Sequence, residues 1–132
     1  MKKSNFKEIM CQHEGQPKIF NNFIWSVKNY DFQDAIIPLR AYSGVAARMI
    51  EVLKYNVDIV YLDSAHEAGE TFMGINLYYD LLREGGVIFG NDYNILPAAR
   101  HDVDLFSKAI KQEIGFCSCK ESNNPTWSFV KQ

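Results

Sequence analysis

The sequence has little cysteine. Only three cysteines occur among its 132 residues, and so small and odd a number does not suggest a disulfide framework. Cys11 lies in the polar start of the chain, and Cys117 and Cys119 are one residue apart near its end. Because this pair supplies fewer ligands than a metal site needs, we interpret all three as reduced, structural thiols.

The chain also has no excess of positive charge and no long apolar segment. The net charge is −2 and the isoelectric point is near 5.9, so a nucleic-acid partner is not expected. No apolar run approaches the roughly 18 residues that cross a bilayer, and the start of the chain has charges but no apolar signal core. We therefore expect a cytoplasmic protein with no membrane partner.

The composition is that of one globular domain, with 47% hydrophobic and 23% charged residues. Residues 1–18 are polar and show no sustained period, so we expect a loosely held N-terminal arm. Residues 19–132 carry the periodic apolar patterns and are expected to form the domain.

The apolar spacing predicts helices that alternate with strands. The segment 57–62 is almost continuously apolar, which predicts a strand buried on both faces. Pro38 places the strand at 35–42 on a sheet edge, and Gly85 and Gly86 would end the third helix. The expected helices are 19–30, 43 to about 56 with Ser43 as its cap, 70–83, and one that begins at Pro97; the expected strands are 35–42, 57–62, 87–90, 115–119 and 127–130.

This order of elements implies an α/β fold with three layers. The sheet would be mostly parallel, with helices on its faces and an antiparallel hairpin formed by the last two strands. In such a sheet, ligands bind beyond the carboxyl ends of the strands. The loops that follow 57–62 and 87–90 are therefore where a functional site is expected.

Both of these loops begin with acidic or amide side chains. If the two strands are neighbours, their ends lie about 5 Å apart, and Asp63 and Asp92 can share one hard cation such as Mg²⁺. Either aspartate can instead be a simple turn former. His66 fits a general base or metal ligand equally as well as an exposed loop residue. The first loop supplies Asp63, Ser64, His66 and Glu67, and the second supplies Asn91, Asp92, Tyr93 and Asn94.

The segment VDIVYLDSAHEAGETFMGINLYYDLLREGGVIFGNDY resembles the fourth strand, following helix and fifth strand of class I S-adenosylmethionine-dependent methyltransferases. More narrowly, it is similar to the branch that includes macrocin and catechol O-methyltransferase-like enzymes, which read D-hydrophobic-hydrophobic-hydrophobic-D-x-x-H and later L-L-x-x-G-G-hydrophobic-hydrophobic-x-x-D-Y. IIPLRAYSGVAARMI and PAARHDVDLFSKAI also resemble family segments, so the similarity runs from about Ile19 onward.

The resemblance implies roles for individual residues. Asp63 and Asp92 would bind a divalent ion near the methyl acceptor, and Asp63 would also face the cofactor. Ser43 would lie near the adenine ring of S-adenosylmethionine, and His66 would stand at the position of the general base. These roles agree chemically, because a cation lowers the pKa of an acceptor hydroxyl and a histidine beside it takes the proton. The implied substrate is a hydroxyl group of a small molecule or sugar.

The chain departs from the family at its start. Family members open with a strand, a G-x-G turn, a helix and a second strand, whereas no two glycines here lie one residue apart. The chain therefore resembles an N-terminally shortened form that lacks the first two strands and the glycine-rich cofactor loop. Their loss would leave the edge of 57–62 bare. We expect either the strand at 35–42 or a second copy in a homodimer to cover that edge.

Three functions remain open from the sequence. The first is a methyltransferase, which is either metal-dependent or metal-independent. Without the glycine-rich loop it is either active or inactive. The second is a non-catalytic remnant that acts as an interaction module. The third is an unrelated Mg-dependent enzyme that uses Asp63, His66 and Asp92.

Overall fold

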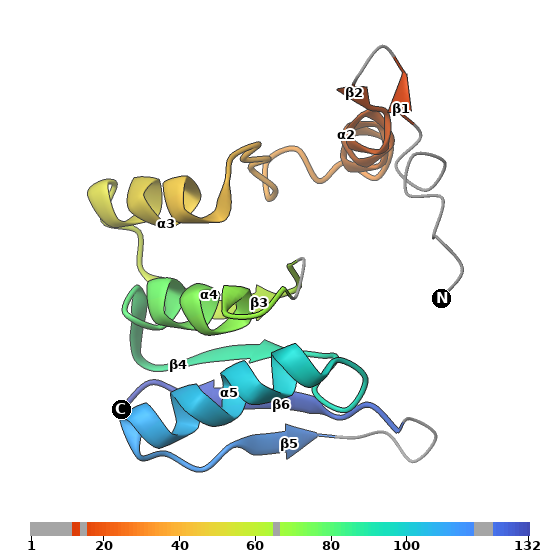
Figure 1. Cartoon of the computed structure of the whole chain (residues 1–132). Coiled ribbons are helices and arrows are strands. Elements are labelled where there is room, and N and C mark those ends of the chain that lie inside the picture. Colours follow the sequence, from red (N-terminus) through yellow and green to blue (C-terminus); the bar gives the residue numbers. More distant parts are fainter. Residues whose placement is uncertain (1–11, 14–15, 65–66, 118–122) are drawn as a thin grey trace. The chain divides into compact units, whose positions relative to one another are not determined.

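The computed structural model describes residues 12–13, 16–64, 67–117 and 123–132. The chain divides into two compact units, residues 1–40 and residues 41–132, and each is described by itself. Figure 1 labels the elements of both. No helix within the described ranges is long and apolar enough to cross a bilayer.

The first unit contains one described helix, α2 (Ile19–Asn29), as the sequence predicted. Its buried side chain is Val27. Two residues of the expected polar arm, β1 (Gln12–His13), pair antiparallel with β2 (Gln16–Pro17).

The strand expected at 35–42 is absent, so that prediction was wrong. The backbone N–H groups of Ala35 and Ile36 donate to the carbonyl of Phe32 in a turn, and Pro38 has no N–H to offer a ladder. The side chain of Ile37 is 82% exposed. This segment therefore forms no strand and is not part of the sheet that contains residues 57–62.

The second unit is an α/β structure built on a mixed four-stranded sheet. Its strands are β3 (Val57–Leu62), β4 (Leu82–Gly90), β5 (Gly115–Cys117) and β6 (Thr126–Val130), in the spatial order β3-β4-β6-β5. β3 and β4 are parallel neighbours, as predicted. The closing pair of β5 and β6 is also confirmed, but β6 runs antiparallel to β4 as well. In the described residues the sheet is therefore mixed rather than mostly parallel.

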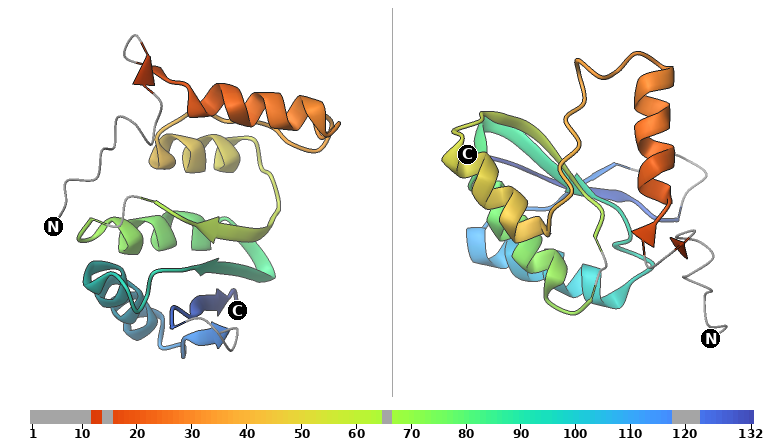
Figure 2. Two further views of the ribbon diagram at one scale, coloured as in Figure 1. Left: turned by 90° about the vertical axis from the view of Figure 1, so that its right-hand side faces the viewer. Right: turned by 90° about the horizontal axis from the view of Figure 1, so that it is seen from above.

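Three helices lie on one face of this sheet: α3 (Ser43–Val52), α4 (Glu70–Tyr79) and α5 (Pro97–Ile110). Figure 2 shows all three on the same side, so residues 41–132 alone form two layers. Between the helices and the sheet lies the core, in which Val103 and Phe106 of α5 meet side chains of the sheet. The core residues are Leu62, Ile75, Tyr79, Leu82, Ile88, Val103, Phe106, Trp127 and Phe129.

The third predicted helix ends earlier than expected. α4 stops at Tyr79, and Leu82, which is buried, already belongs to β4. Gly85 has φ of +74° inside this strand rather than after a helix. The pairing with β3 shifts there, because Val57 faces Leu82 but Ile59 faces Val87. The two glycines thus form a bulge in the strand.

The strand β3 is not buried on both faces, which corrects the prediction. Ile59 is 67% exposed and Tyr61 52% exposed, whereas Leu62 is buried. Successive side chains of a strand point to opposite faces, and within this unit the helices cover one face only. Among the described residues, β3 pairs with β4 alone, so its outer edge remains bare.

Candidate functional site

The carboxyl ends of β3 and β4 lie side by side. Leu62 pairs with Gly90 at the last step of the parallel ladder, so Asp63 and Asn91 follow paired residues. Gly90 is needed here, because a Cβ at this position would lie 2.5 Å from the Trp127 ring and 2.7 Å from the Leu62 carbonyl oxygen. The close packing of β6 against β4 therefore fixes the place where the second loop begins.

Tyr61 connects the two aspartates. Its phenol lies near the carboxylates of Asp63 and Asp92, which follow β3 and β4. Burial, the charge of Asp63 and the charge of Asp92 all raise the pKa of Tyr61 above its ordinary value. Both carboxylates thus act on the same phenol, and the structure brings these two predicted site residues into one neighbourhood.

The turn after β4 is held by its neighbours. Asp92 adopts a left-handed backbone with φ of +64°, and its carboxylate accepts a hydrogen bond of 3.1 Å from the amide of Asn124. The indole N–H of Trp127 donates to the carbonyl of Asn91 at 3.0 Å. The Asn94 amide donates to the carbonyl of Asn123 at 2.8 Å. Both sides of the turn are therefore tied to residues 123–127.

Tyr93 joins this turn to α5. Its hydroxyl donates to Asp104 at 2.7 Å, and the guanidinium of Arg100 lies 4.9 Å from the centre of its ring. Arg100 also donates to the side-chain oxygen of Asn94 at 2.6 Å. Burial and the bond to Asp104 raise the pKa of Tyr93, and Arg100 opposes that shift. These contacts line a hollow of about 290 Å³, to which Pro97 and His101 also contribute.

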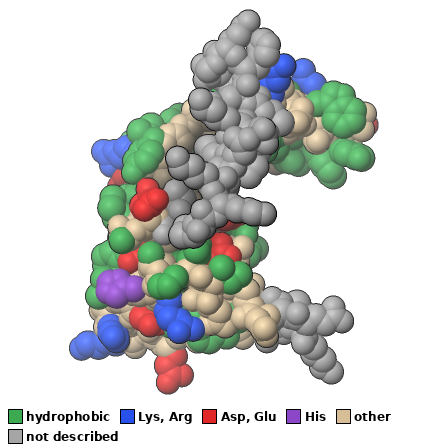
Figure 3. Space-filling model, turned by 45° about the vertical axis from the view of Figure 1, so that its right-hand side comes forward, with side chains coloured by type: hydrophobic (Ala, Val, Ile, Leu, Met, Phe, Trp, Pro, Cys, Tyr) green, Lys and Arg blue, Asp and Glu red, His purple; other side chains and the backbone are tan. Residues whose placement is uncertain are grey.

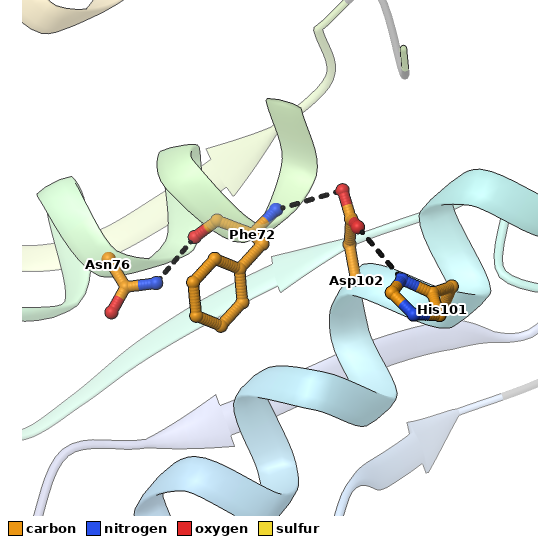
Figure 4. Close-up of polar contacts among 4 residues, drawn as sticks. All are labelled: Phe72, Asn76, His101 and Asp102. Carbon is orange, nitrogen blue, oxygen red and sulfur yellow. Dashed lines mark hydrogen bonds and ion pairs between the residues drawn. The ribbon is translucent and has the colours of Figure 1, made fainter. Parts of the chain in front are cut away.

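The start of α4 is capped by a buried carboxylate from α5 (Figure 4). Gly69, at the N-cap position, has no side chain to use. Asp102, which is 2% exposed, accepts the backbone N–H of Phe72 at 3.2 Å instead, and its other oxygen lies 3.3 Å from Nδ1 of His101. The imidazole is otherwise exposed, so His101 lies at the surface. A negative charge at this helix end is favourable.

A cavity of about 280 Å³ lies beside the end of β3. Ser43 lines it from the first residue of α3, where it does not cap the helix as predicted. Its hydroxyl instead donates to the hydroxyl oxygen of Tyr78 at 3.3 Å, and the Tyr78 hydroxyl donates to the Ser43 carbonyl at 2.9 Å. The lining residues are Ala41, Tyr42, Ser43, Gly44, Leu62, Ser64, Glu70, Met73, Gly74 and Leu77.

The side-chain oxygens that follow β3 and β4 supply some, but not all, of the ligands that a hard cation needs. Asp63 and Asp92 supply carboxylates, and the side-chain oxygen of Asn91 is buried without a hydrogen-bond partner. Such an orphan acceptor is rare and costly. No cluster of three or more His, Cys, Asp or Glu side chains suited to a metal ion occurs in the described parts of the chain. Two carboxylates and one amide oxygen are thus the ligands available there.

The remaining predicted base, His66, lies outside the described residues. Sequence reasoning missed Tyr61, Tyr78 and Asp102. Tyr61 could have been found, because it lies two residues before Asp63 and side chains at that spacing share a strand face. The partners of Tyr78 and Asp102 are 35 and 30 residues away in the chain, and no local pattern signals such contacts.

Comparisons with known proteins give one relative. Over 75 residues the chain is 27% identical to an uncharacterized protein of Acanthamoeba polyphaga mimivirus. The match covers 57% of this chain and 29% of the viral protein, so it spans less than a third of that relative. No family model matches the chain, and no solved structure does.

Proposed function

We propose that this chain is a class I methyltransferase-like protein with a Rossmann-like sheet. Its ancestral reaction is transfer of a methyl group from S-adenosylmethionine to a hydroxyl of a small molecule or sugar. One observation supports this most: a cavity lined by Ser43 and Ser64 lies at the carboxyl end of β3, beside the neighbourhood that Asp63 and Asp92 share. This is where α/β sheets bind ligands.

The cavity is suited to part of the cofactor. At about 280 Å³ it is at the small end of ligand pockets, which run from roughly 300 to 1,000 Å³. Leu62, Met73 and Leu77 give it apolar walls, while Ser43 and Ser64 supply hydroxyls. It therefore suits one flat ring system such as adenine. The glycine-rich loop that holds the rest of the cofactor in the family has no counterpart in the sequence.

Calorimetric titration of the chain with S-adenosylmethionine tests the proposal. We expect binding in the micromolar to millimolar range, weakened at least tenfold in Leu77→Trp, because the larger ring would fill the cavity. Leu105→Trp is the matched control, since Leu105 is about equally exposed but lies on α5 away from the cavity. No heat at millimolar ligand would refute cofactor binding and favour the non-catalytic interaction module.

A divalent cation such as Mg²⁺ is the second proposed ligand. Asp63, Asp92 and Asn91 would hold it, and when bound it would acidify an acceptor hydroxyl for attack on the methyl group. The orphan oxygen of Asn91 is the observation that favours it. The same site, used without S-adenosylmethionine, is what the alternative Mg-dependent enzyme would require.

Titration with Mn²⁺, followed by electron paramagnetic resonance, tests the cation site separately. Asp63→Asn should abolish the bound signal, whereas Asp80→Asn should keep it, because the Asp80 carboxylate is exposed and pairs with Lys131. A bound signal that survives Asp63→Asn would mean that the site is wrong. A signal present without any cofactor binding would favour the alternative enzyme.

We also propose that the chain forms a homo-oligomer in which a second copy covers the edge of β3. The strand has no Lys or Pro to discourage pairing, and Ile59 and Tyr61 remain exposed on it. Light scattering should show a concentration-dependent dimer that Ile59→Lys weakens. Val130→Lys, at the exposed last residue of β6, is the control. A monomer at all concentrations would contradict the homo-oligomer without touching the ligand sites.

A further inference from the structure

The helix α5 carries two opposite charges that do not pair with each other. Arg100 and Asp104 are four residues apart on the helix, a spacing at which opposite charges can form an ion pair. Both side chains belong to the described residues, yet they form no ion pair with each other. Both line the hollow of about 290 Å³ beside the turn after β4. The hollow therefore contains a cation and a carboxylate that do not neutralise each other.

Tyr93 binds these two charged groups at different places. The guanidinium of Arg100 lies 4.9 Å from the centre of the Tyr93 ring, whereas the Tyr93 hydroxyl donates to the carboxylate of Asp104 at 2.7 Å. Both charges thus contact one half-buried aromatic side chain. A ligand that bridges them must carry its own opposite charges only a few bonds apart.

Both charged groups keep hydrogen-bonding capacity for a ligand. A guanidinium has five N–H donors, and one N–H of Arg100 donates to the side-chain oxygen of Asn94 at 2.6 Å. A carboxylate accepts at both of its oxygens, and Oδ1 of Asp104 accepts from Tyr93. A ligand carboxylate can therefore accept from Arg100, while a ligand ammonium can donate to Oδ2 of Asp104.

The other lining residues do not replace either charge. Asn94 uses its amide nitrogen in a bond to a backbone carbonyl and its oxygen in the bond to Arg100. Nδ1 of His101 lies 3.3 Å from the buried carboxylate of Asp102, so Nε2 is the ring nitrogen that remains for a ligand. This nitrogen can accept from an ammonium or donate to a carboxylate. Pro97 contributes apolar surface.

We propose that this hollow binds a free α-amino acid. The ligand carboxylate accepts from Arg100, and the ligand ammonium donates to Asp104. In an α-amino acid both charged groups are attached to one carbon, which suits two partners that contact the same tyrosine. A ligand that is only an anion is repelled by Asp104, and one that is only a cation is repelled by Arg100.

This inference does not depend on the proposed function. The described residues that line the hollow and those that line the cavity beside β3 have no member in common. The hollow also contains none of the residues proposed to bind a cation, Asp63, Asn91 and Asp92. A result at one site therefore leaves the proposals for the others unchanged.

Three compounds with one side chain test the ligand class on the whole wild-type chain. L-leucine carries both charges, N-acetyl-L-leucine lacks the ammonium, and L-leucinamide lacks the carboxylate. Each is added while the backbone amide shifts are followed by nuclear magnetic resonance. We expect L-leucine to bind with a dissociation constant of roughly 1–10 mM, because so small a ligand gains little in an open hollow. The two singly charged compounds should bind about threefold more weakly or worse.

Two variants assign the binding to these charges. Arg100→Gln should weaken L-leucine about threefold or more but should not weaken L-leucinamide, which has no carboxylate. Asp104→Asn should weaken L-leucine by a similar factor but should not weaken N-acetyl-L-leucine, which has no ammonium. The asparagine oxygen can still accept from Tyr93. Lys108→Gln, an exposed charge in the last turn of α5 and outside the hollow, is the matched control and should keep the wild-type affinities.

Several results would overturn the inference. One is the absence of shift changes at up to about 50 mM L-leucine, well above the expected dissociation constant. Others are equal binding of L-leucine and either singly charged compound, shift changes that leave residues 93–104 unaffected, or an affinity for L-leucine that both variants retain. The comparison of the three compounds uses the wild-type chain, so it decides the question even if a variant does not fold. Titration with S-adenosylmethionine tests a different cavity and is judged separately.

Discussion

The loops after β3 and β4 both begin at paired strand ends, yet they are held very differently. The second is tied down by Trp127, Asn123 and Asn124, and its aspartate sits in a left-handed conformation. The first begins with an exposed aspartate, Asp63, whose charge acts on Tyr61 of β3. Asp92 is held in place, whereas Asp63 is more exposed. A site between them can accept ligands of different size, because only Asp63 has to move.

The largest effect is expected in the core beneath the loop after β4, which is the more firmly held of the two. Trp127 is 1% exposed, and its indole both fills the core and bonds the Asn91 carbonyl. Trp127→Ala should lower the free energy of unfolding by about 3–5 kcal/mol. Urea unfolding followed by circular dichroism measures this. Trp25→Ala, at an exposed position of α2, should change it by less than about 0.5 kcal/mol.

Removing the cap of α4 should loosen the first loop from its far end. Asp102→Ala leaves the Phe72 N–H without an acceptor in a buried place, at a cost of about 2 kcal/mol. Asp102→Asn keeps one acceptor oxygen and should cost about half as much. Hydrogen exchange should accelerate at the Phe72 amide. If that amide stays as protected as in the wild type, the cap does not hold the helix start.

Tyr93→Phe should weaken the rigid loop by about 1.5 kcal/mol, because its hydroxyl bonds the Asp104 carboxylate. The folded pKa of Tyr93 is raised, so below a pH of about 10 both states keep the proton and the stability is complete. As the pH rises further, the unfolded chain loses its proton first and stability falls. Unfolding curves across this range should show a smaller fall in Tyr93→Phe, while Tyr55→Phe follows the wild type.

The two aspartates themselves give the smallest expected effects. Asp92→Ala should cost about 1 kcal/mol, since it removes the acceptor of Asn124 and leaves alanine with a positive φ. Asp63→Ala should cost less than about 0.5 kcal/mol because Asp63 is exposed. Thermal unfolding of both variants under one set of conditions compares them. Equal losses would mean that the two loops are held alike.

The sequence predicted those elements whose signals are local. Ala99, Val103 and Phe106 lie on the buried face of α5, at helical spacing. The continuous apolar runs of β3 and β4 predicted two buried strands, and these are parallel neighbours. Double glycine was ambiguous, because Gly85 and Gly86 suit a helix end as well as a bulge. The sequence could not predict that Ile59 is exposed. An edge strand with one face uncovered by helices can have the same composition as a strand that is buried on both faces.

The candidate site was predicted in outline only. Asp63 and Asp92 meet around Tyr61 because parallel strands end at the same side of a sheet, which is a rule of topology. The direction of the Ser43 hydroxyl depends on Tyr78, a distant residue on another helix. Hydrogen-bond directions of this kind follow from tertiary contacts, and no spacing along the chain encodes them.

Hydrophobic side chains lie among charged ones on the face shown in Figure 3. Ile59 and Tyr61 of β3 and Val45 of α3 are among the exposed hydrophobic residues. The order of the strands in the sheet affects how long apolar surface stays exposed before folding is complete. β4 receives its second neighbour from β6, whose Trp127 and Phe129 fill the core. During synthesis α4 and α5 are therefore made before residues 126–130 can cover their apolar sides, and exposed apolar surface of this kind favours aggregation.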